Sequence, residues 1–199
     1  MRKTVKIVFF SSLSALLLSA CGGADSPPAA EPLLEPLAPE GWADASADFI
    51  GTDGEKKGAV AIVDAPTGIL IRLDLSGLSH GWHGIHLHQV GDCSDHENGF
   101  MASGPHINPE GRAHGLLNPA GPDRGDLPNL YAGPDERASA EFFSAMVSVR
   151  PSEAAAATGR HPALDEDGFA VVIHANPDDH MTQPIGGAGP RVACAAIRP

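Results

Sequence analysis

Five of the ten histidines stand in short, dissimilar segments between positions 86 and 174. They are His86 and His88 in Gly-Ile-His-Leu-His, His106 in Ser-Gly-Pro-His-Ile-Asn-Pro, His114 in Arg-Ala-His-Gly and His174 in Val-Val-Ile-His-Ala-Asn-Pro. Imidazole is the commonest protein ligand for copper and zinc. A fold that uses these residues together must bring distant segments around a metal.

His86 and His88 are two residues apart in a predicted strand, so the alternation of side chains places both rings on one face. Two adjacent imidazoles suit a metal and are costly to bury otherwise. From this pair alone, a metal-ligand role and a structural role both remain open.

The remaining pattern is that of a β protein with many turns. The chain has 23 glycines and 18 prolines in 199 residues, which suits short strands joined by long loops. Apolar Ile71, Leu73 and Leu75 alternate with polar residues, as in a half-buried strand. This strand is predicted at 68–78, with others at 45–51, 58–66, 84–90, 140–149, 168–175 and 191–197, and one short helix at 153–158. We expect an all-β antiparallel sandwich or barrel.

Residues 89–138 are rich in Gly, Pro, Asp and Asn and show little strand pattern. Unstructured connections of that length in a compact domain are usually functional. The segment contains His106 and His114, which is consistent with a ligand-bearing loop.

The first 20 residues are typical of an export signal. Three basic residues precede an apolar run at 7–18 that is too short to span a bilayer. The end of this run, Leu-Ser-Ala-Cys at 18–21, resembles a bacterial lipobox, which implies cleavage before Cys21 and lipidation of its thiol. An ordinary secretory signal that is cut nearby is the alternative.

Residues 21–43 are predicted to form a Pro/Ala-rich tether between the lipid and a domain at 44–199. We expect membrane attachment through Cys21 in the cell envelope, and Gly22 favours the outer membrane, facing the periplasm. Without residues 1–20 the chain keeps 10 basic and 25 acidic residues, a net charge of about −15, which argues against nucleic acid as a partner.

Three cysteines are present, and Cys93 and Cys194 remain as a pair if Cys21 carries lipid. Disulfides persist in exported proteins. A bridge between the two would close a loop of about 100 residues and stabilise the fold by about 4–5 kcal/mol on the chain-entropy model. Two free thiols are the alternative.

From Ala45 to Pro199 the chain resembles copper–zinc superoxide dismutase, especially its bacterial exported form. The stretches that carry the resemblance occur in order along the domain: Leu-Ser-Gly-Leu (75–78), His-Gly-Ile-His-Leu-His (83–88), Gly-Asp-Cys-Ser (91–94), Ser-Gly-Pro-His-Ile-Asn-Pro (103–109), His-Gly-Leu (114–116), Gly-Asp-Leu-Pro-Asn-Leu (125–130), Val-Val-Ile-His-Ala-Asn-Pro-Asp-Asp (171–179) and Gly-Ala-Gly-Pro-Arg-Val-Ala-Cys (187–194). The resemblance implies a Greek-key antiparallel β-barrel or sandwich with long metal-binding and electrostatic loops. It also implies an enzyme that dismutates superoxide with copper and zinc ions as cofactors, in defence of the envelope.

The resemblance implies a role for each matching residue. The implied copper ligands are His86, His88, His106 and His174, and the implied zinc ligands are His106, which bridges the two ions, His114 and Asp126. His106 would also supply a proton, and Arg191 would guide the anionic substrate. Asp178 would hydrogen-bond His86 and His114, and Cys93 would pair with Cys194.

One position departs from the family pattern, which has a histidine three residues before the zinc aspartate. Here Asp123 stands in that place. Three interpretations are open. In the first, Asp123 is itself a zinc ligand. In the second, zinc is bound by three protein ligands together with water or with another histidine such as His96 or His180, and in the third the site holds little zinc.

The other histidines match no ligand position and are expected at the surface or in hydrogen bonds: His80, His83, His96, His161 and His180. The alternative to the enzyme is a non-catalytic copper-binding lipoprotein of the envelope, and a purely structural lipoprotein is a third hypothesis. Retention of the implied copper ligands and of Arg191 favours the enzyme. The sequence does not decide between a monomer and a homodimer.

Overall fold

The structure, a computed structural model, describes residues 37–199. The predicted signal peptide, the lipidation site Cys21 and most of the predicted tether lie outside the described residues. Within residues 37–199, no helix has the length and apolar character that crossing a membrane would require.

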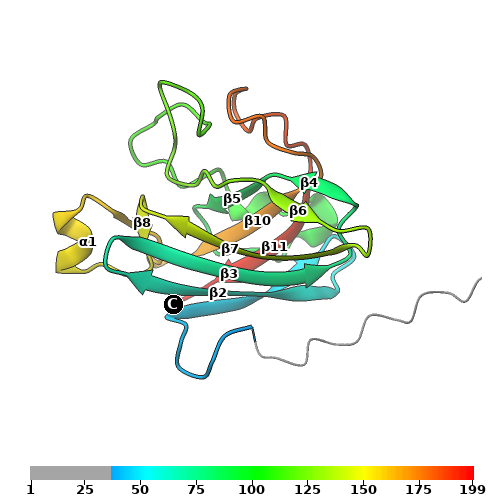
Figure 1. Cartoon of the computed structure of the whole chain (residues 1–199), viewed down its shortest axis with the longest axis horizontal. Helices are drawn as coiled ribbons and strands as arrows, with labels where there is room; N and C mark the ends of the chain where they lie inside the picture. Colours follow the sequence, from blue (N-terminus) through cyan, green and yellow to red (C-terminus); the bar gives the residue numbers. More distant parts are fainter. Residues whose placement is uncertain (1–36) are drawn as a thin grey trace, which may run out of the picture. The chain divides into compact units, whose positions relative to one another are not determined.

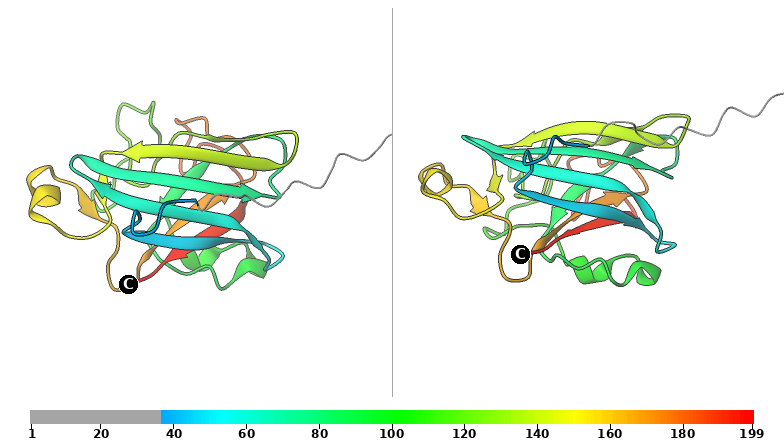
Figure 2. Two further views of the ribbon diagram at one scale, coloured as in Figure 1. Left: turned by 60° about the horizontal axis from the view of Figure 1, so that its bottom comes forward. Right: turned by 90° about the horizontal axis from the view of Figure 1, so that it is seen from below.

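The core of the fold is one antiparallel sheet of seven strands (Figure 1). In spatial order these are β5 (Ile85–His88), β10 (Phe169–His174), β11 (Arg191–Ile197), β1 (Ala45–Gly51), β2 (Lys56–Ala65), β3 (Gly68–Ser76) and β7 (Arg137–Ser144). The sheet curls, so that β1, β2, β3 and β7 form one layer and β5, β10 and β11 the other (Figure 2). After β3 the chain crosses to β5 at one end of the sheet and returns to β7 at the other. The prediction of an all-β Greek-key fold is confirmed.

The remaining elements are short. The strands β4 (Gly81–His83) and β6 (Leu130–Ala132) form an antiparallel ribbon, and β8 (Val147–Ser148) pairs in parallel with β9 (His161–Pro162). Two 3-10 turns, η1 (His96–Asn98) and η2 (Met101–Ser103), follow Cys93. The one α-helix among residues 37–199, α1 (Glu153–Ala157), is capped at its N-terminus by Ser152, whose side chain accepts a hydrogen bond from the Ala155 amide.

The strand predictions hold best where one strand has two neighbours. The strands β1 and β11 have the predicted bounds. The strand predicted at 140–149 is wrong at both ends, because β7 pairs with β3 along its whole length and ends opposite the start of that strand, at Ser144 beside Ile69. The strand β6 lies inside the segment predicted to be loop.

Alternation along β5 fixes the faces of its side chains. Ile85 and Leu87 are fully buried in the hydrophobic core between the layers. His86 and His88 therefore point away from the core, to the outer side of the sheet. Ile71, Leu73 and Leu75 of β3 are buried in the same core, as their alternation predicts.

Residues that precede β1 already contact the sheet. The Arg72 guanidinium lies 4.7 Å from the centroid of the Trp42 ring and donates a 3.4 Å hydrogen bond to the Leu37 carbonyl. The last described part of the predicted tether thus packs against β3.

Two long loops rise on the same side of the sheet, beside β5 and β10 (Figure 1, green and orange). We call them the 104–126 loop and the 175–190 loop. They are joined by hydrogen bonds: the Gln183 side chain accepts from the His114 amide at 2.9 Å and donates to the His114 carbonyl at 2.8 Å. The outward side chains Ala170 and Val172 of β10 pack instead against Cys93 and Phe100, in and beside the η1–η2 segment.

Candidate metal centre

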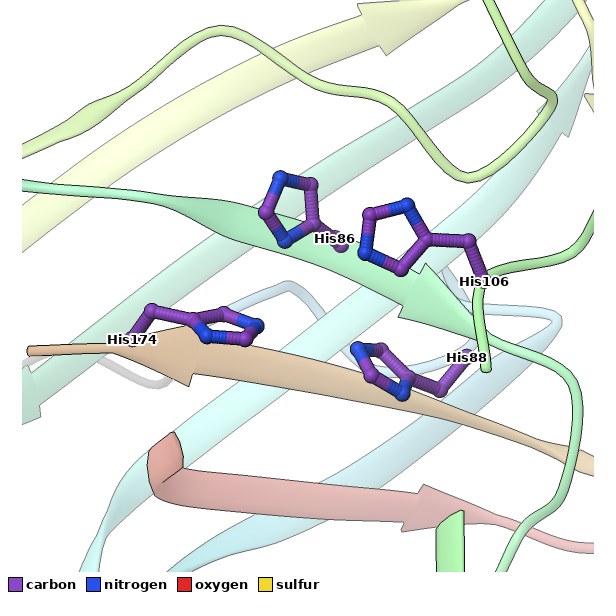
Figure 3. A group of neighbouring side chains, drawn as sticks. All are labelled: His86, His88, His106 and His174. Carbon is purple, nitrogen blue, oxygen red and sulfur yellow. The ribbon is translucent and has the colours of Figure 1, made fainter. Parts of the chain in front are cut away.

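Four histidine rings converge on the outer side of β5 and β10 (Figure 3). Their candidate ligand atoms all lie within 4.8 Å of one another, and all four residues are buried: His86, His88, His106 and His174. The first two come from β5 and the last from the end of β10, which pairs with β5. The sequence therefore predicted correctly that these distant segments meet.

His106 reaches the cluster because the 104–126 loop pairs with the free edge of β5. The Leu87 amide donates to the Gly125 carbonyl, and the Ile107 amide donates to the Leu87 carbonyl, both at 2.9 Å. A side chain at Gly125 would begin 2.3 Å from the Leu87 carbonyl oxygen, so glycine is required for this approach. The pairing places His106 beside His88 and Asp126 beside His86.

In each of three of these rings, one nitrogen is hydrogen-bonded and holds the ring in place. His88 Nδ1 lies 2.7 Å from the Gly104 carbonyl, His174 Nδ1 lies 2.9 Å from the Gly189 carbonyl, and His86 Nε2 lies 3.0 Å from Asp178 Oδ2. Each bond fixes the tautomer, so the other nitrogen presents a lone pair.

The nitrogens that remain form the copper-type group. They are buried without a hydrogen-bond partner: His86 Nδ1, His88 Nε2, His106 Nε2 and His174 Nε2. Buried polar atoms are normally paired, and four unpaired lone pairs that converge on one point suit a cation. An all-imidazole set fits copper.

Burial keeps the rings of His86, His88 and His174 uncharged. It lowers the pKa of His86 to about 3 and that of His174 to about 4, and it lowers the pKa of His88 well below its ordinary value. Neutral imidazole is the form that binds a metal, so these three ligands are ready near neutral pH.

A second group adjoins the first and includes carboxylates. The candidate ligand atoms of His86, His106, His114 and Asp126 also lie within 4.8 Å of one another. His114 Nδ1 is 2.6 Å from Asp126 Oδ1, and His106 Nδ1 is 3.6 Å from the same oxygen. Despite the short distance, His114 Nδ1 and Asp126 Oδ1 do not form a directed hydrogen bond. Two polar atoms that lie close together without a hydrogen bond between them are arranged as two ligands of one cation would be.

Opposing effects set the charges in the second group. Burial would lower the pKa of His114, but the carboxylates of Asp126 and Asp178 outweigh it and raise the pKa to about 10. Burial would raise the pKa of Asp126, but His106 and His114 outweigh it and hold that pKa well below its usual range. The carboxylate is thus charged and available to a divalent cation.

Asp123 faces the same histidines. Its Oδ2 lies 3.0 Å from His106 Nδ1 and 3.9 Å from His114 Nδ1, while its Oδ1 accepts a hydrogen bond from the Gly125 amide. Asp126 is divided in the same way, because its Oδ2 accepts from the amides of Gly115 and Asp123. Each carboxylate keeps one oxygen on the backbone and turns the other toward the rings.

The two stray histidines considered for zinc have other contacts. His96 Nδ1 lies 3.3 Å from the Thr52 carbonyl, near the turn between β1 and β2. His180 Nδ1 lies 3.2 Å from Asp178 Oδ2, on the oxygen that also faces His86.

Two further histidines have hydrogen-bonding roles, as expected. His83 is buried rather than exposed, with ring nitrogens 2.7 Å from the carbonyls of His174 and Ser79. His80 Nε2 lies 2.8 Å from the Tyr131 hydroxyl.

Asp178 joins the two groups. Its Oδ2 lies 3.0 Å from His86 Nε2 and its Oδ1 lies 3.1 Å from His114 Nε2, as the resemblance implies. Asn129 fixes the main chain of Asp178 by accepting from the Asp178 amide and donating to its carbonyl, both at 2.8 Å. A side chain at Gly186 would meet Asp178 Oδ1 at 1.6 Å, so that glycine makes room for it.

Sequence reasoning did not single out Asn129 or Gln183. Asn129 lies in the Gly-Asp-Leu-Pro-Asn-Leu stretch that carries the resemblance, which was a usable signal. Gln183 holds the main chain of His114 from 69 residues away, and no local pattern marks it.

Arg191 is fixed beside the four histidines. Its guanidinium donates to the carbonyls of Phe100 and Gly104 at 2.6 and 2.9 Å and to Ser103 Oγ at 3.0 Å. Together with His88 and other residues it lines a cavity of about 460 Å³. Burial lowers the pKa of this guanidinium, but arginine stays charged at any physiological pH.

The disulfide secures the acceptors of Arg191. Cys93 and Cys194 are bonded, with 5.8 Å between their Cα atoms, and the bond ties the start of the η1–η2 segment to β11. Phe100 and Ser103 belong to or adjoin that segment, and Arg191 begins β11. The predicted pairing is confirmed.

Comparison with known proteins agrees with this geometry. Residues 56–197 match the family model described as "Copper/zinc superoxide dismutase (SODC)". The chain is 49% identical over 147 residues to "Superoxide dismutase [Cu-Zn]" of Caulobacter vibrioides, covering 73% of this chain and 80% of the relative. It is 36% identical over 155 residues to "Superoxide dismutase [Cu-Zn] 2" of Aquifex aeolicus, covering 77% and 86%.

Solved structures are similar as well. The SOD-like protein from Bacillus subtilis superposes with a TM-score of 0.68 at 30% identity, covering 76% of this chain and 96% of that one. The Cu/Zn superoxide dismutase from Brucella abortus superposes with a TM-score of 0.59 at 25% identity, covering 77% and 98%. The chain belongs to the copper/zinc superoxide dismutase family, enzymes that convert superoxide to dioxygen and hydrogen peroxide with copper and zinc as cofactors.

Proposed function

We propose that this centre dismutates superoxide with copper on the four converging ring nitrogens of His86, His88, His106 and His174. The observation that carries the proposal is the set of four buried, unpaired nitrogens beside the fixed charge of Arg191. Bound copper supplies a one-electron couple, through which one superoxide is oxidised to dioxygen and a second is reduced, with two protons, to hydrogen peroxide.

The protein contributes position, charge and a proton route. Arg191 attracts and orients the anion in the cavity. His106 would hold and deliver a proton at Nε2 when that nitrogen is not bound to copper, while its Nδ1 stays among the carboxylates of Asp123 and Asp126. Burial opposes protonation of His106, but those two carboxylates outweigh it and raise the pKa of the ring.

The direct test is metal content and dismutase activity, measured together on protein refolded with copper and zinc, copper alone, or zinc alone. We expect activity only in the samples that contain copper. Bound copper without activity would contradict the proposal and support a non-catalytic copper-binding protein. Failure to bind copper at all would contradict both.

The proposal assigns zinc to His106, His114, Asp126 and Asp123. Carboxylates are normal zinc ligands, and a tetrahedral site with two imidazoles and two carboxylates is chemically ordinary. Aspartate is shorter than histidine, and the hydrogen bond from the Asp123 amide to Asp126 Oδ2 draws the loop in. Asp123 Oδ2 lies at hydrogen-bond distance, 3.0 Å, from His106 Nδ1 and 3.9 Å from His114 Nδ1, and this position beside two zinc-assigned rings supports the assignment.

Asp123→Ala tests this assignment, with exposed Asp135→Ala as the matched control. We expect zinc affinity to fall by about 100-fold or more in the first variant, because a ligand is lost, and copper affinity to change little. A zinc chelator titration monitors both metals. Wild-type zinc affinity in Asp123→Ala would show that three protein ligands suffice.

We also propose where the enzyme is located. A lipid anchor on Cys21 would hold it at the outer membrane of the cell envelope, facing the periplasm. The Leu-Ser-Ala-Cys sequence and the disulfide support it, since disulfides persist in exported proteins. Labelled palmitate incorporated into the expressed full chain, compared with Cys21→Ser, is the test. Equal labelling of both would contradict the anchor, and fractionation of the membranes identifies the one that carries it.

We also propose that the protein forms a homodimer. Trp82 and Tyr131 pack against each other on the β4–β6 ribbon, with ring centroids 5.0 Å apart, yet remain 56% and 45% exposed. Paired aromatic side chains of this kind are enriched in interfaces. Sedimentation of the wild type and of Trp82→Glu provides the test, and a monomeric wild type would contradict the dimer.

A further inference from the structure

The 175–190 loop, which covers one side of the metal centre, carries no basic residue of its own. Between Ala175 and Pro190 there is no lysine or arginine, while Asp178 and Asp179 are present. The whole chain has a formal charge of −12, which repels an anion such as superoxide. Attraction must therefore come from charges near the cavity.

The 104–126 loop supplies a second cation to the cavity. The cavity of about 460 Å³ is lined by two basic side chains, Arg191 and Arg112. Arg112 belongs to the 104–126 loop and is exposed. Among residues 37–199 its guanidinium has no hydrogen bond or ion pair.

The turn that carries Arg112 is well fixed. Asn108 Oδ1 accepts from the Arg112 amide at 2.9 Å, and Asn108 Nδ2 donates to the Arg112 carbonyl at 2.8 Å. Gly111 takes a φ of 64°, which glycine adopts without strain. These contacts hold the backbone of Arg112 in place beside the cavity that its side chain lines.

Neighbouring charges do not cancel that of Arg112. Glu110 is paired with Arg124, whose Nε donates to Glu110 Oε1 at 2.9 Å. Arg124 itself donates to the carbonyls of Met146 and Gly159, so this arginine is committed to the loop structure. Of the two arginines in the 104–126 loop, Arg124 is therefore paired elsewhere and Arg112 lines the cavity.

The carboxylate of Asp123 explains why a second positive charge is useful in this cavity. Asp123 also lines the cavity, and it adds a carboxylate at a position where the family pattern has a neutral histidine. That carboxylate weakens the positive potential that draws an anion inward. One arginine in the same loop restores the balance.

We propose that Arg112 is a second guidance residue, which draws superoxide into the cavity ahead of Arg191. It is a positioning residue, because it acts through the electrostatic field rather than on the reacting atoms. The inference rests on the proposed dismutase function and deepens it by assigning the outer guidance charge of this chain.

The test compares Arg112→Gln, Arg112→Glu and Arg112→Lys with Arg150→Gln as the matched control. Arg150 is exposed and does not line the cavity, so its variant makes the same change in net charge elsewhere. The kcat/KM of holoenzyme is measured from about 10 mM to about 1 M salt, where the screening length falls from about 30 Å to about 3 Å. Azide binding to the copper-loaded proteins is measured in parallel.

At low salt we expect kcat/KM to fall about twofold in Arg112→Gln and about fourfold in Arg112→Glu, the effect of a unit charge about 10 Å away in water. The azide dissociation constant rises by similar factors. Arg112→Lys stays near wild type, and Arg150→Gln changes less than Arg112→Gln. At about 1 M salt the differences vanish, with metal content and Tm unchanged throughout.

Two results would overturn the inference. In the first, an active wild type and Arg112→Gln have the same kcat/KM and azide affinity at every salt concentration. In the second, the loss persists unchanged at high salt, which indicates a structural rather than an electrostatic effect. An inactive copper-loaded wild type is a different outcome, because it would contradict the proposed function itself.

Discussion

At the scale of single residues, each metal-facing side chain divides its polar atoms between two tasks. One nitrogen of His88 or His174 is bound to a backbone carbonyl, and the other is left unpaired and buried. Asp126 divides its oxygens in the same way, with Oδ2 on backbone amides and Oδ1 unpaired. Asp123 has Oδ1 on a backbone amide and Oδ2 on His106 Nδ1. The bound atom fixes the tautomer or rotamer, so the free atom is preorganised for the metal before it binds.

Arg191→Glu tests the role of this residue. We expect kcat/KM to fall by about 10-fold to 100-fold at low salt, because the charge that attracts the anion is inverted. Copper affinity should change much less, since no copper-facing nitrogen is bonded to Arg191. Stopped-flow activity and copper titration measure the two effects, and Arg191→Lys, which keeps the charge, is the control. Unchanged turnover at low salt would refute this role.

At the scale of elements, strands provide the platform and loops complete the site. The strands β5 and β10 supply three of the four copper-type ligands, and the 104–126 loop adds His106 by pairing with the edge of β5. The 175–190 loop contributes Asp178, which contacts both groups. The disulfide holds a further segment, η1–η2, whose acceptors orient Arg191.

Removal of the disulfide in a Cys93→Ala, Cys194→Ala double variant should affect both stability and activity. We expect a loss of about 2–5 kcal/mol in the free energy of unfolding, since the unfolded chain is no longer cross-linked. Activity at temperatures well below Tm should also fall, because the carbonyls that hold Arg191 lie in the released segment. Urea unfolding and activity are measured on metal-loaded protein. Full activity with reduced stability would show that the segment is held without the bond.

At the scale of the whole molecule, burial makes the centre sensitive to pH when no metal is bound. The pKa values of His86 and His174 are lowered to about 3 and about 4 in the folded state, against about 6.5 in an unfolded chain. As the pH falls below about 6.5 the unfolded chain takes up protons that the folded rings do not, so acid favours unfolding. His114, with its pKa raised to about 10, acts oppositely: its contribution is complete below about 6.5 and is lost as the pH rises toward 10.

We therefore expect the metal-free protein to lose a few kcal/mol of stability between about pH 6.5 and pH 4. The lowered pKa values of Asp126 and Asp178 extend the loss to lower pH, because their stabilisation disappears as they are protonated. Urea unfolding in the presence of a chelator, repeated across this range, measures the effect. His86→Gln is the informative comparison, since it removes one titrating ring and should flatten the profile. Stability that rises as the pH falls from 6.5 would contradict this account.

Much of the fold and site follows from sequence because the relevant signals are local. Alternation in residues 68–78 predicts a strand, of which the structure contains 68–76, and the strand-like run at 191–197 is a strand with the predicted bounds. The short contexts around His86, His106 and His174 identify the copper-type ligands, since ligand identity resides in a few adjacent residues. The side-chain period of two in a strand is enough to place His86 and His88 on one face.

Other features depend on contacts between distant segments. The end of β7 is set by its register with β3, and the position of His114 is held by Gln183, 69 residues away. The aspartate at position 123 is visible in the sequence, but its role depends on the direction of its Oδ2, which faces His106 across the loop.

The sequence by itself determined the fold class, the family and the identity of the metal-facing histidines. Tertiary structure alone decided which oxygen of Asp123 faces the rings, and that Arg112 shares a cavity with Arg191. The physical reason is that residue type and strand period are encoded locally. The direction of a carboxylate and the neighbours of a charge are fixed by hydrogen bonds and packing between loops that are far apart in the chain.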